Sequence, residues 1–185
     1  MSGPLAGGAS ACAPIAAHPM TFTRRYTVGI GEFALSSQAG EVIVTHALGS
    51  CVAVTLWDPV TNVAGLLHFL LPDANLGGDR ASRQPTAFAN PGIPILLEAA
   101  AAMGFEKQRS AIFLVGGASV GGGGGTSVLD IGRRNVLAAR SVLWRCGALV
   151  KGEVVGGSTA RTVWMNAADG RIHVMHGHDL VANLP

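Results

Sequence analysis

The clearest alternation of apolar and turn-forming residues in this chain lies between residues 51 and 71. A β-branched run at residues 52–57 is followed by the turn-forming cluster 58–62, and a second apolar run covers residues 63–71. β-branched and aromatic residues favour strands, whereas Asp, Pro and Asn favour turns. The pattern therefore predicts a β-hairpin whose first strand follows Cys51 and whose second strand carries His68.

The register of this hairpin decides which side chains meet across it. With an even loop, for example with Trp57 opposite Asn62, Cys51 lies directly opposite His68. Directly paired residues have Cβ atoms about 4.5–5.5 Å apart on one face of the sheet. An odd loop would slip the register and send one of the two side chains to the other face. An even loop therefore places a thiol and an imidazole side by side.

Similar patterns assign secondary structure to the rest of the chain. Residues 92–103 read as a helix with Pro94 in its first turn and Gly104 as its stop, and Asp130 or Ser127 could cap a second helix over residues 132–146. Residues 73–85 read as a surface loop. Short strands are expected at residues 26–30, 42–45, 111–115 and 153–155, and the Asp169-Gly170 turn predicts a hairpin of residues 161–166 and 171–175.

These elements predict a single domain of mixed α-helices and β-strands. A chain of 185 residues is long enough to bury a core without disulfides or metal ions. Residues 1–20 are rich in Ala, Gly and Pro, and we expect them to form a disordered tail. Residues 21–185 are then the folded domain.

Composition and charge argue against several classes of partner. Charged residues make up only 13% of the chain, the net charge is +2 and the basic residues are scattered, so the clustered basic face of a nucleic-acid-binding protein is missing. No apolar run approaches the roughly 18 residues of a membrane span, and the first twenty residues do not resemble a signal peptide. Three cysteines at irregular spacings fit neither a disulfide framework nor a zinc site, which favours a reducing, cytoplasmic compartment.

Cys51, His68 and Thr45 are the residues whose chemistry stands out. A free cysteine is most often a small buried hydrophobe, and a lone histidine in an apolar run is usually a core residue with one hydrogen bond. A nucleophilic role needs a thiolate, which a nearby base can generate. Thr45 flanks the same Gly49-Ser50 corner as Cys51, and its hydroxyl could orient the imidazole. The three residues together favour a thiol site over two unrelated core residues.

Other candidate sites have simpler structural explanations. Five glycines, residues 121–125, are not followed by Gly-Lys-Ser/Thr, so a flexible loop is favoured over a phosphate-binding loop. His173, His176 and His178 have no Cys, Asp or Glu between them at ligand spacing, which favours solvated histidines over a metal site. Cys146 falls on the apolar face of its expected helix and is assigned to the core.

The surroundings of the three residues resemble a known family. Thr45, Cys51 and His68 follow the order Thr-x5-Cys-x16-His, with Leu-Gly-Ser before the cysteine and His-Phe-Leu-Leu-Pro at the histidine, which resembles the chemoreceptor glutamine deamidases, the CheD family. The resemblance extends over roughly residues 25–175, and the departures, at Phe88-Ala89-Asn90, after Ser119 and at Ala160, leave the three positions intact. Further matching motifs are Val28-Gly29-Ile30-Gly31-Glu32, Gly116-Gly117-Ala118, Ile131-Gly132-Arg133-Arg134-Asn135 and Val155-Gly156-Gly157 with Arg161.

The resemblance implies hydrolysis of glutamine side-chain amides to glutamate on the cytoplasmic helices of methyl-accepting chemotaxis receptors, with no metal or organic cofactor. It implies Cys51 as nucleophile, His68 as base and Thr45 as orienting residue, and the backbone N–H groups at Gly49 and Ser50 are candidate donors to the oxyanion. The implied fold is a layered α+β domain of mostly antiparallel strands, related to the cytotoxic-necrotizing-factor-like cysteine hydrolases. The residues with an implied supporting role are Gly116, Gly117, Asn135, Gly156, Gly157 and Arg161.

Two alternatives stay open at this point. The chain could be a non-catalytic adaptor of the chemotaxis array that holds a receptor, or a chemotaxis phosphatase, in the same cleft. It could also be a cysteine hydrolase that acts on a small amide. Activity on free glutamine but not on a receptor helix would favour the last of these.

Overall fold

The computed structural model describes residues 22–119 and 130–185. The expected tail at residues 1–20, the glycine run 121–125 and the alternative helix cap Ser127 lie outside the described residues. Within the described part, the chain forms two five-stranded sheets and a small number of helices, so the expected mixed α+β class is confirmed.

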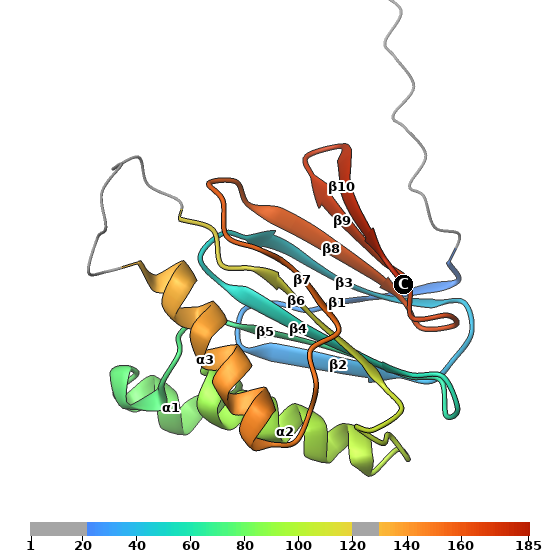
Figure 1. Ribbon diagram of the computed structural model, residues 1–185, viewed down its shortest axis with the longest axis horizontal. Helices are drawn as coiled ribbons and strands as arrows, with labels where there is room; N and C mark the ends of the chain where they lie inside the picture. Colours follow the sequence, from blue (N-terminus) through green and yellow to red (C-terminus); the bar gives the residue numbers. More distant parts are fainter. Residues whose placement is uncertain (1–21, 120–129) are drawn as a thin grey trace, which may run out of the picture.

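The two sheets are built from strands that are distant in sequence (Figure 1). The first sheet has the order β1-β3-β8-β9-β10, with β1 at Arg24–Thr27, β3 at Glu41–Leu48, β8 at Arg161–Asn166, β9 at Ile172–His176 and β10 at Asp179–Leu184. The second sheet has the order β2-β5-β4-β6-β7, with β2 at Glu32–Ser36, β5 at Val63–Phe69, β4 at Val52–Asp58, β6 at Ala111–Gly116 and β7 at Gly152–Val155.

Most neighbouring strands are antiparallel. The two parallel pairs are β1 with β3 and β6 with β7, so both sheets are mixed. The two long helices are α2, Ala89–Ala101, and α3, Ile131–Arg145. None of the helices in the described residues is both long enough and apolar enough to cross a membrane.

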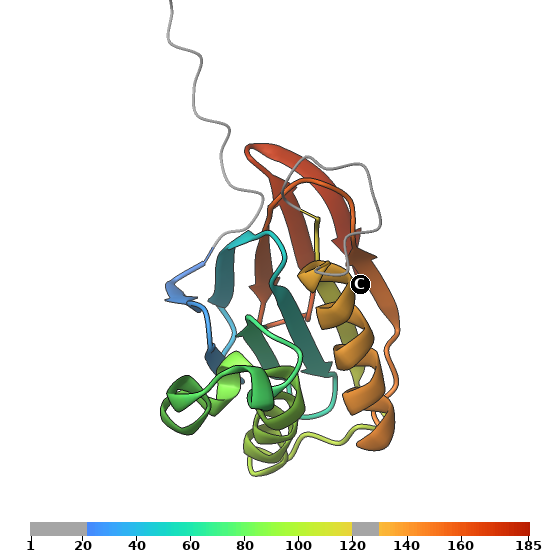
Figure 2. The ribbon, with the colours of Figure 1, turned by 90° about the vertical axis from the view of Figure 1, so that its left-hand side faces the viewer.

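Alternating side chains of the central strand β4 divide the core into two layers. Val52, Val54 and Leu56 pack with the apolar faces of α2 and α3, whereas Ala53 points into the cluster between the two sheets. Figures 1 and 2 show the helices covering the second sheet, with the first sheet on its other side. The order of layers is therefore sheet, sheet, helices, and the inner face of β4 and β5 is enclosed by the first sheet.

The hairpin of β4 and β5 is present, but its register differs from the expected one. Asp58 pairs with Val63 and Val52 pairs with Phe69, so the loop has four residues and the expected pairing of Trp57 with Asn62 is wrong. The cause lies in the turn: Asp58 accepts a hydrogen bond from the N–H of Val60, and Asn62 adopts a left-handed conformation with φ of 55°, so Asn62 belongs to the loop. The loop is still even, and the inward-facing set of side chains is preserved.

Other boundaries differ from the sequence prediction in informative ways. Helix α2 begins at Ala89, three residues earlier than expected, because the N–H of Ala89 is anchored by the carbonyl of Leu71; Pro94 therefore lies inside the helix. The expected surface loop at 73–85 contains the short helices η1, Ala74–Leu76, and α1, Asp79–Arg83, and runs into η2, Pro85–Ala87. Strand β10 was not predicted. The expected cap of α3 is confirmed, since the Asp130 side chain accepts from the N–H of Arg133.

Candidate active site

Thr45 is held at the point where strand β3 leaves its regular pairing. Between Thr45 and Leu48 the register of β3 against β8 shifts, and Ala47 takes a φ of 57°, so the chain bends toward the Gly49-Ser50 corner. Thr45 is fully buried. Its Oγ1 lies 2.7 Å from the carbonyl oxygen of Val28 and 2.8 Å from Nδ1 of His68. The hydroxyl of the first sheet thus reaches across to the histidine of the second.

This pair of hydrogen bonds fixes the tautomer of His68. A hydroxyl has one proton, and the carbonyl of Val28 can only accept, so Thr45 donates to Val28. Thr45 must then accept from Nδ1–H of His68. The neutral ring consequently carries its proton on Nδ1 and leaves Nε2 with a free lone pair.

Nε2 of His68 is a buried nitrogen without a hydrogen-bond partner in the described part of the chain. His68 is only 2% exposed, and buried polar atoms are normally paired. Burial lowers the pKa of His68 to about 4, while hydrogen bonding toward Val28 and the carboxylate of Glu32 act in the opposite direction. The ring is therefore neutral at pH 7, and Nε2 is available as a base.

Cys51 and His68 lie on the same face of the second sheet, although they are not directly opposite. His68 pairs with Ala53, and Cys51 is two residues from Ala53, which makes Cys51 a diagonal neighbour of His68. Residues at diagonal positions on two neighbouring strands are about 7–8 Å apart, with their Cβ atoms somewhat closer, and long side chains can bridge this distance. The cysteine and the alternate residues of β4 and β5 pack in the same cluster between the sheets. The expected direct pairing of Cys51 with His68 is therefore wrong, because the four-residue loop shifts the register by two residues, whereas the shared face of the sheet is confirmed.

The Cys51 thiol is buried, with 6% of the residue exposed. Burial raises the pKa of the thiol, while its own backbone N–H and the positive charge of Arg80 act to lower it. A raised thiol pKa and a lowered imidazole pKa both favour the neutral forms. In the resting structure both groups are thus neutral, as a thiol and an imidazole.

The corner that carries Cys51 is held by the glycines after β6. Gly117 N–H donates to the carbonyl of Cys51 at 2.8 Å, and Ala118 N–H donates to the carbonyl of Gly49 at 2.8 Å. Gly116 has a φ of 116°, and a Cβ there would lie 2.4 Å from the carbonyl oxygen of Cys51. Only glycine allows this approach. The Gly116-Gly117 motif is therefore explained by its contact with the corner that carries Cys51.

The N–H groups of the corner differ in their availability. Gly49 N–H donates to the carbonyl of Ala47 at 2.8 Å, so it is already used. Among the hydrogen bonds between described residues, none uses the N–H of Ser50. Of the two expected oxyanion donors, Gly49 N–H is therefore already paired, and Ser50 N–H has no partner among the described residues.

Asn135 ties the two halves of the site together. It is fully buried on α3, and its Nδ2 donates to the carbonyls of Ser50 at 2.8 Å and Leu70 at 2.9 Å. Ser50 precedes the thiol and Leu70 follows His68 by two residues. A single amide thus fixes the spacing between the chain that carries the cysteine and the chain that carries the histidine.

Gly156, Gly157 and Arg161 support the glycine turn from the other side. Gly156 N–H donates to the carbonyl of Gly116 at 2.9 Å, and the carbonyl of Gly157 accepts from the N–H of Ser119 at 2.8 Å. Arg161 Nη2 donates to the carbonyl of Gly156 at 2.8 Å. These three residues contact the layer beneath the Cys51 corner, not the thiol itself.

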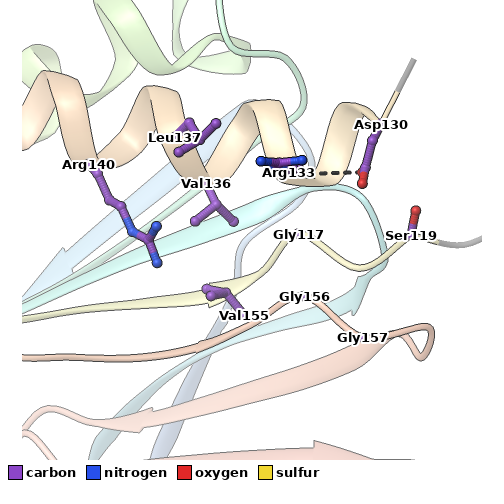
Figure 3. A pocket seen from close by; sticks show the side chains of 10 residues that line it. All are labelled: Gly117, Ser119, Asp130, Arg133, Val136, Leu137, Arg140, Val155, Gly156 and Gly157. Carbon is purple, nitrogen blue, oxygen red and sulfur yellow. Dashed lines mark hydrogen bonds between the residues drawn. The ribbon is translucent and has the colours of Figure 1, made fainter. Parts of the chain in front are cut away.

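A pocket of about 400 Å³ opens beside this glycine layer (Figure 3). Its walls are the first half of α3, the turn at Gly117 and Ser119, and the end of β7 with Gly156 and Gly157. Cys51 does not line it, but Gly117, which binds the Cys51 carbonyl, does. The pocket is therefore adjacent to the Cys51 corner and separated from the thiol by the glycine turn.

The competing residues are placed apart from this centre. Cys146, just after α3, is partly buried and packs against the cluster beneath the helices. His173 and His176 lie on β9, and His178 lies in the turn that follows it. Residues 22–119 and 130–185 contain no group of three or more His, Cys, Asp or Glu side chains that could hold a metal ion.

Sequence reasoning missed two charged residues near the site, Glu32 and Arg80. Glu32 is the direct partner of His68 on the neighbouring strand β2, and Arg80 on α1 acts on the Cys51 thiol. The signal for Glu32 was present in the Gly-x-Gly-Glu turn, because Glu32 closes that turn through a hydrogen bond from Gly29 N–H. No local signal identifies Arg80.

The fold and the site define a class: a mixed α+β domain that buries a thiol, an imidazole and a threonine hydroxyl between its two sheets. Comparison with known proteins places the chain more closely. Residues 70–176 match the family described as CheD, chemotactic sensory transduction, and the chain belongs to this family. This matched segment begins just after His68, so it contains the supporting motifs and not the three central residues.

Curated relatives align over more of the chain. A probable chemoreceptor glutamine deamidase CheD 2 from Anaeromyxobacter dehalogenans is 44% identical over 158 residues, covering 85% of this chain and 98% of the relative. A probable chemoreceptor glutamine deamidase CheD 1 from Syntrophus aciditrophicus is 39% identical over 147 residues, covering 80% and 91%. A probable chemoreceptor glutamine deamidase from Pyrococcus abyssi is 38% identical over 152 residues, covering 82% and 91%.

Proposed function

We propose that this chain is a cytoplasmic chemoreceptor glutamine deamidase that uses Cys51 as its nucleophile. The observation that carries the proposal is the buried Nε2 of His68, which has no partner among the described residues and lies on the same sheet face as the Cys51 thiol. The names of the relatives supply the substrate class, glutamine side chains of chemoreceptors. The related fold type would be that of the cytotoxic-necrotizing-factor-like cysteine hydrolases.

The first half of the reaction forms a thioester. As Sγ of Cys51 attacks the carboxamide carbon of the glutamine, the thiol proton passes to Nε2 of His68. The N–H groups of Ser50 and Cys51 hold the oxyanion that forms on the carbonyl oxygen. The imidazolium then returns its proton to the amide nitrogen, the C–N bond breaks, and ammonia leaves.

The second half releases the product. A water molecule gives a proton to Nε2 of His68 and attacks the thioester carbon, and collapse of the adduct expels the Cys51 thiolate, which regains the proton. The sum is glutamine plus water giving glutamate plus ammonia. Thr45 keeps the proton of the neutral ring on Nδ1 throughout, so Nε2 faces the reaction in both halves.

The pocket beside the glycine layer is where we place the receptor residues next to the target glutamine. It shares Gly117 with the nucleophile corner, and its walls include the exposed side chains of α3. A chemotaxis phosphatase is the regulatory partner that the family resemblance suggests for the same face.

The proposal is tested by peptide mapping of a receptor cytoplasmic fragment after incubation with the full-length protein. We expect the mass change of amide-to-acid conversion at a subset of glutamines, with one ammonia released for each. Free glutamine at the same amide concentration serves as the comparison. An unmodified fragment would reject the deamidase and favour an adaptor, while hydrolysis of free glutamine alone would favour a small-amide hydrolase.

A further inference from the structure

Glu32 occupies the position on β2 that is directly paired with His68 on β5. Directly paired residues of antiparallel strands project to the same face, with Cβ atoms about 4.5–5.5 Å apart. The alternation along β2 agrees, because Ala34, two residues further, packs in the cluster between the sheets together with Leu66. Glu32 and His68 therefore project from neighbouring positions on one face of the sheet, with Glu32 exposed at its edge and His68 buried.

The backbone turn before β2 fixes this carboxylate. Oε2 of Glu32 accepts from Gly29 N–H at 2.9 Å, and Glu32 N–H closes the turn by donating to the Gly29 carbonyl at 3.1 Å. Gly31 N–H donates to the carbonyl of His68 at 2.7 Å. The same four-residue turn thus holds the backbone of the histidine and the side chain of the glutamate.

The hydrogen bonds of Thr45 supply no negative charge near the His68 ring. Thr45 and the Val28 carbonyl are neutral, so they orient His68 without balancing the positive charge it acquires from Cys51. The ring is almost fully buried, which penalises that charge. Among the described residues, the carboxylate of Glu32 acts to raise the pKa of His68, which is the direction that favours the protonated ring.

We propose that Glu32 is a positioning residue of the deamidation reaction, whose carboxylate stabilises the His68 imidazolium while the bond between Sγ and the substrate carbon forms. Glu32 itself gains and loses no proton in this step. The proton moves only from Cys51 to His68 and then to the leaving nitrogen. The inference rests on the proposed function, and it assigns the Gly29-to-Glu32 turn a role that goes beyond folding.

The test compares Glu32→Gln with Glu98→Gln. Glutamine at position 32 keeps the length of the side chain and an oxygen that accepts from Gly29, and it removes only the charge. Glu98, on the solvent-exposed side of α2, is the matched control. With a receptor fragment as substrate, we expect Glu32→Gln to lower kcat about threefold to tenfold with an unchanged KM, and Glu98→Gln to leave both unchanged.

A second readout separates charge stabilisation from a structural defect. Loss of the carboxylate makes the imidazolium less stable, so the acid limb of kcat/KM moves to lower pH by about 0.5 to 1 even as the plateau falls. In the Cys51→Ala background, which needs no substrate, a histidine NMR titration should show the pKa of His68 lowered by the same amount. A structural defect would lower the plateau without moving the limb.

The outcomes distinguish this inference from the proposed function. If the unaltered protein deamidates the receptor fragment and Glu32→Gln matches it in rate and in acid limb, the role of Glu32 is rejected and the deamidase stands. A shifted His68 titration with an unchanged kcat also rejects the role in the reaction. If the unaltered protein is inactive on the receptor fragment, the proposed function fails, while the NMR titration still reports whether Glu32 acts on His68.

Discussion

The two ends of the β4–β5 hairpin carry opposite kinds of buried polar chemistry. At the turn, the fully buried carboxylate of Asp58 accepts from Arg109 Nε at 2.8 and 3.0 Å and from the N–H groups of Val60 and Glu106, both at 2.9 Å. At the open end, His68 is buried with one ring nitrogen bonded to Thr45 and the other unpaired. The turn end of this hairpin thus holds a carboxylate with all its hydrogen bonds made, and the open end holds an imidazole with one unpaired nitrogen.

The difference shows how the same burial can serve stability or reactivity. Burial alone would raise the pKa of Asp58, but Arg109 and the two backbone N–H groups outweigh it and hold that pKa well below its usual value, so the charge is retained. At His68 the hydrogen-bond partner is neutral and the carboxylate of Glu32 is exposed, so burial dominates and the pKa falls to about 4. The turn end is committed to one protonation state, whereas the open end can accept a proton when Cys51 reacts.

The largest effect on activity is expected when the proposed base, His68, is removed. We expect His68→Gln to lower kcat for receptor deamidation by about a thousandfold, within the 10²–10⁴ contribution typical of a positioned base. The measurement is ammonia release from a receptor fragment under saturating substrate. Asp58→Asn, assayed at a temperature where it remains folded, should retain kcat within about twofold. Equal losses in the two variants would contradict the division between the ends of the hairpin.

The largest effect on stability is expected when the buried carboxylate of Asp58 at the turn is removed. Asp58→Ala leaves Arg109 without its main partner and two backbone N–H groups unpaired, so we expect the free energy of unfolding to fall by about 3–5 kcal/mol. Urea denaturation at pH 7 measures this. Glu106→Gln removes the other carboxylate that pairs with Arg109, but its side chain is 63% exposed, so a loss below about 1 kcal/mol is expected. A similar cost for both changes would argue against a special role for the buried ion.

Acid titration of stability should separate the two ends by pH window. Because the pKa of His68 is lowered from 6.5 to about 4 by folding, its contribution is fully present above pH 6.5 and is lost as the pH falls to about 4, by up to about 3 kcal/mol. The pKa of Asp58 is also lowered, from 3.8, so its contribution is lost only below that value. Urea denaturation from pH 7 to pH 4 should show the first loss, and His68→Leu should abolish it. An unchanged slope in that variant would assign the loss to other groups.

The smallest effect is expected from the relay that sets the tautomer. Thr45→Val keeps the shape of the side chain but removes the hydroxyl between Val28 and His68. The neutral ring can then carry its proton on Nε2, and this nitrogen no longer has a lone pair with which to act as a base. We expect kcat to fall about 10- to 100-fold, by analogy with other positioned general bases. Thr45→Ser should recover most of the rate. A Ser variant as slow as the Val variant would indicate that the methyl group matters more than the hydroxyl.

Local patterns predicted the site better than they predicted its surroundings. The β-branched run and the Asp-Pro turn predicted the hairpin, and Cys51 and His68 fall on one face only because the loop has an even number of residues. The exact register was not predicted, because it depends on the conformation of the loop, in which Asp58 accepts from Val60 N–H and Asn62 has a positive φ. Arg109 and Glu106, from beyond helix α2, bind the same Asp58 carboxylate, and no local pattern predicts these contacts.

The same limit explains the supporting residues. Glu32 meets His68 only because β2 adds to the edge of β5, and Asn135 meets Ser50 only because α3 packs over the second sheet. The order of strands in a sheet and the position of a helix on that sheet are determined by the packing of the whole core, not by residues that are close in sequence. The sequence motif identified Asn135 as a supporting residue. Its hydrogen bonds to the carbonyls of Ser50 and Leu70 could be found only in the folded structure.

The central claim is that the open end of the hairpin carries the nucleophile, and the protein offers a matched pair of thiols to test it. Cys51→Ala and Cys146→Ala each remove one buried or partly buried thiol, one at the site and one beneath the helices. The measurement is the rate of ammonia release from a receptor fragment. We predict that Cys51→Ala loses at least a thousandfold, roughly the scale seen when a nucleophile is deleted, and that Cys146→Ala keeps the full rate. Retention of the rate in folded Cys51→Ala would contradict the account.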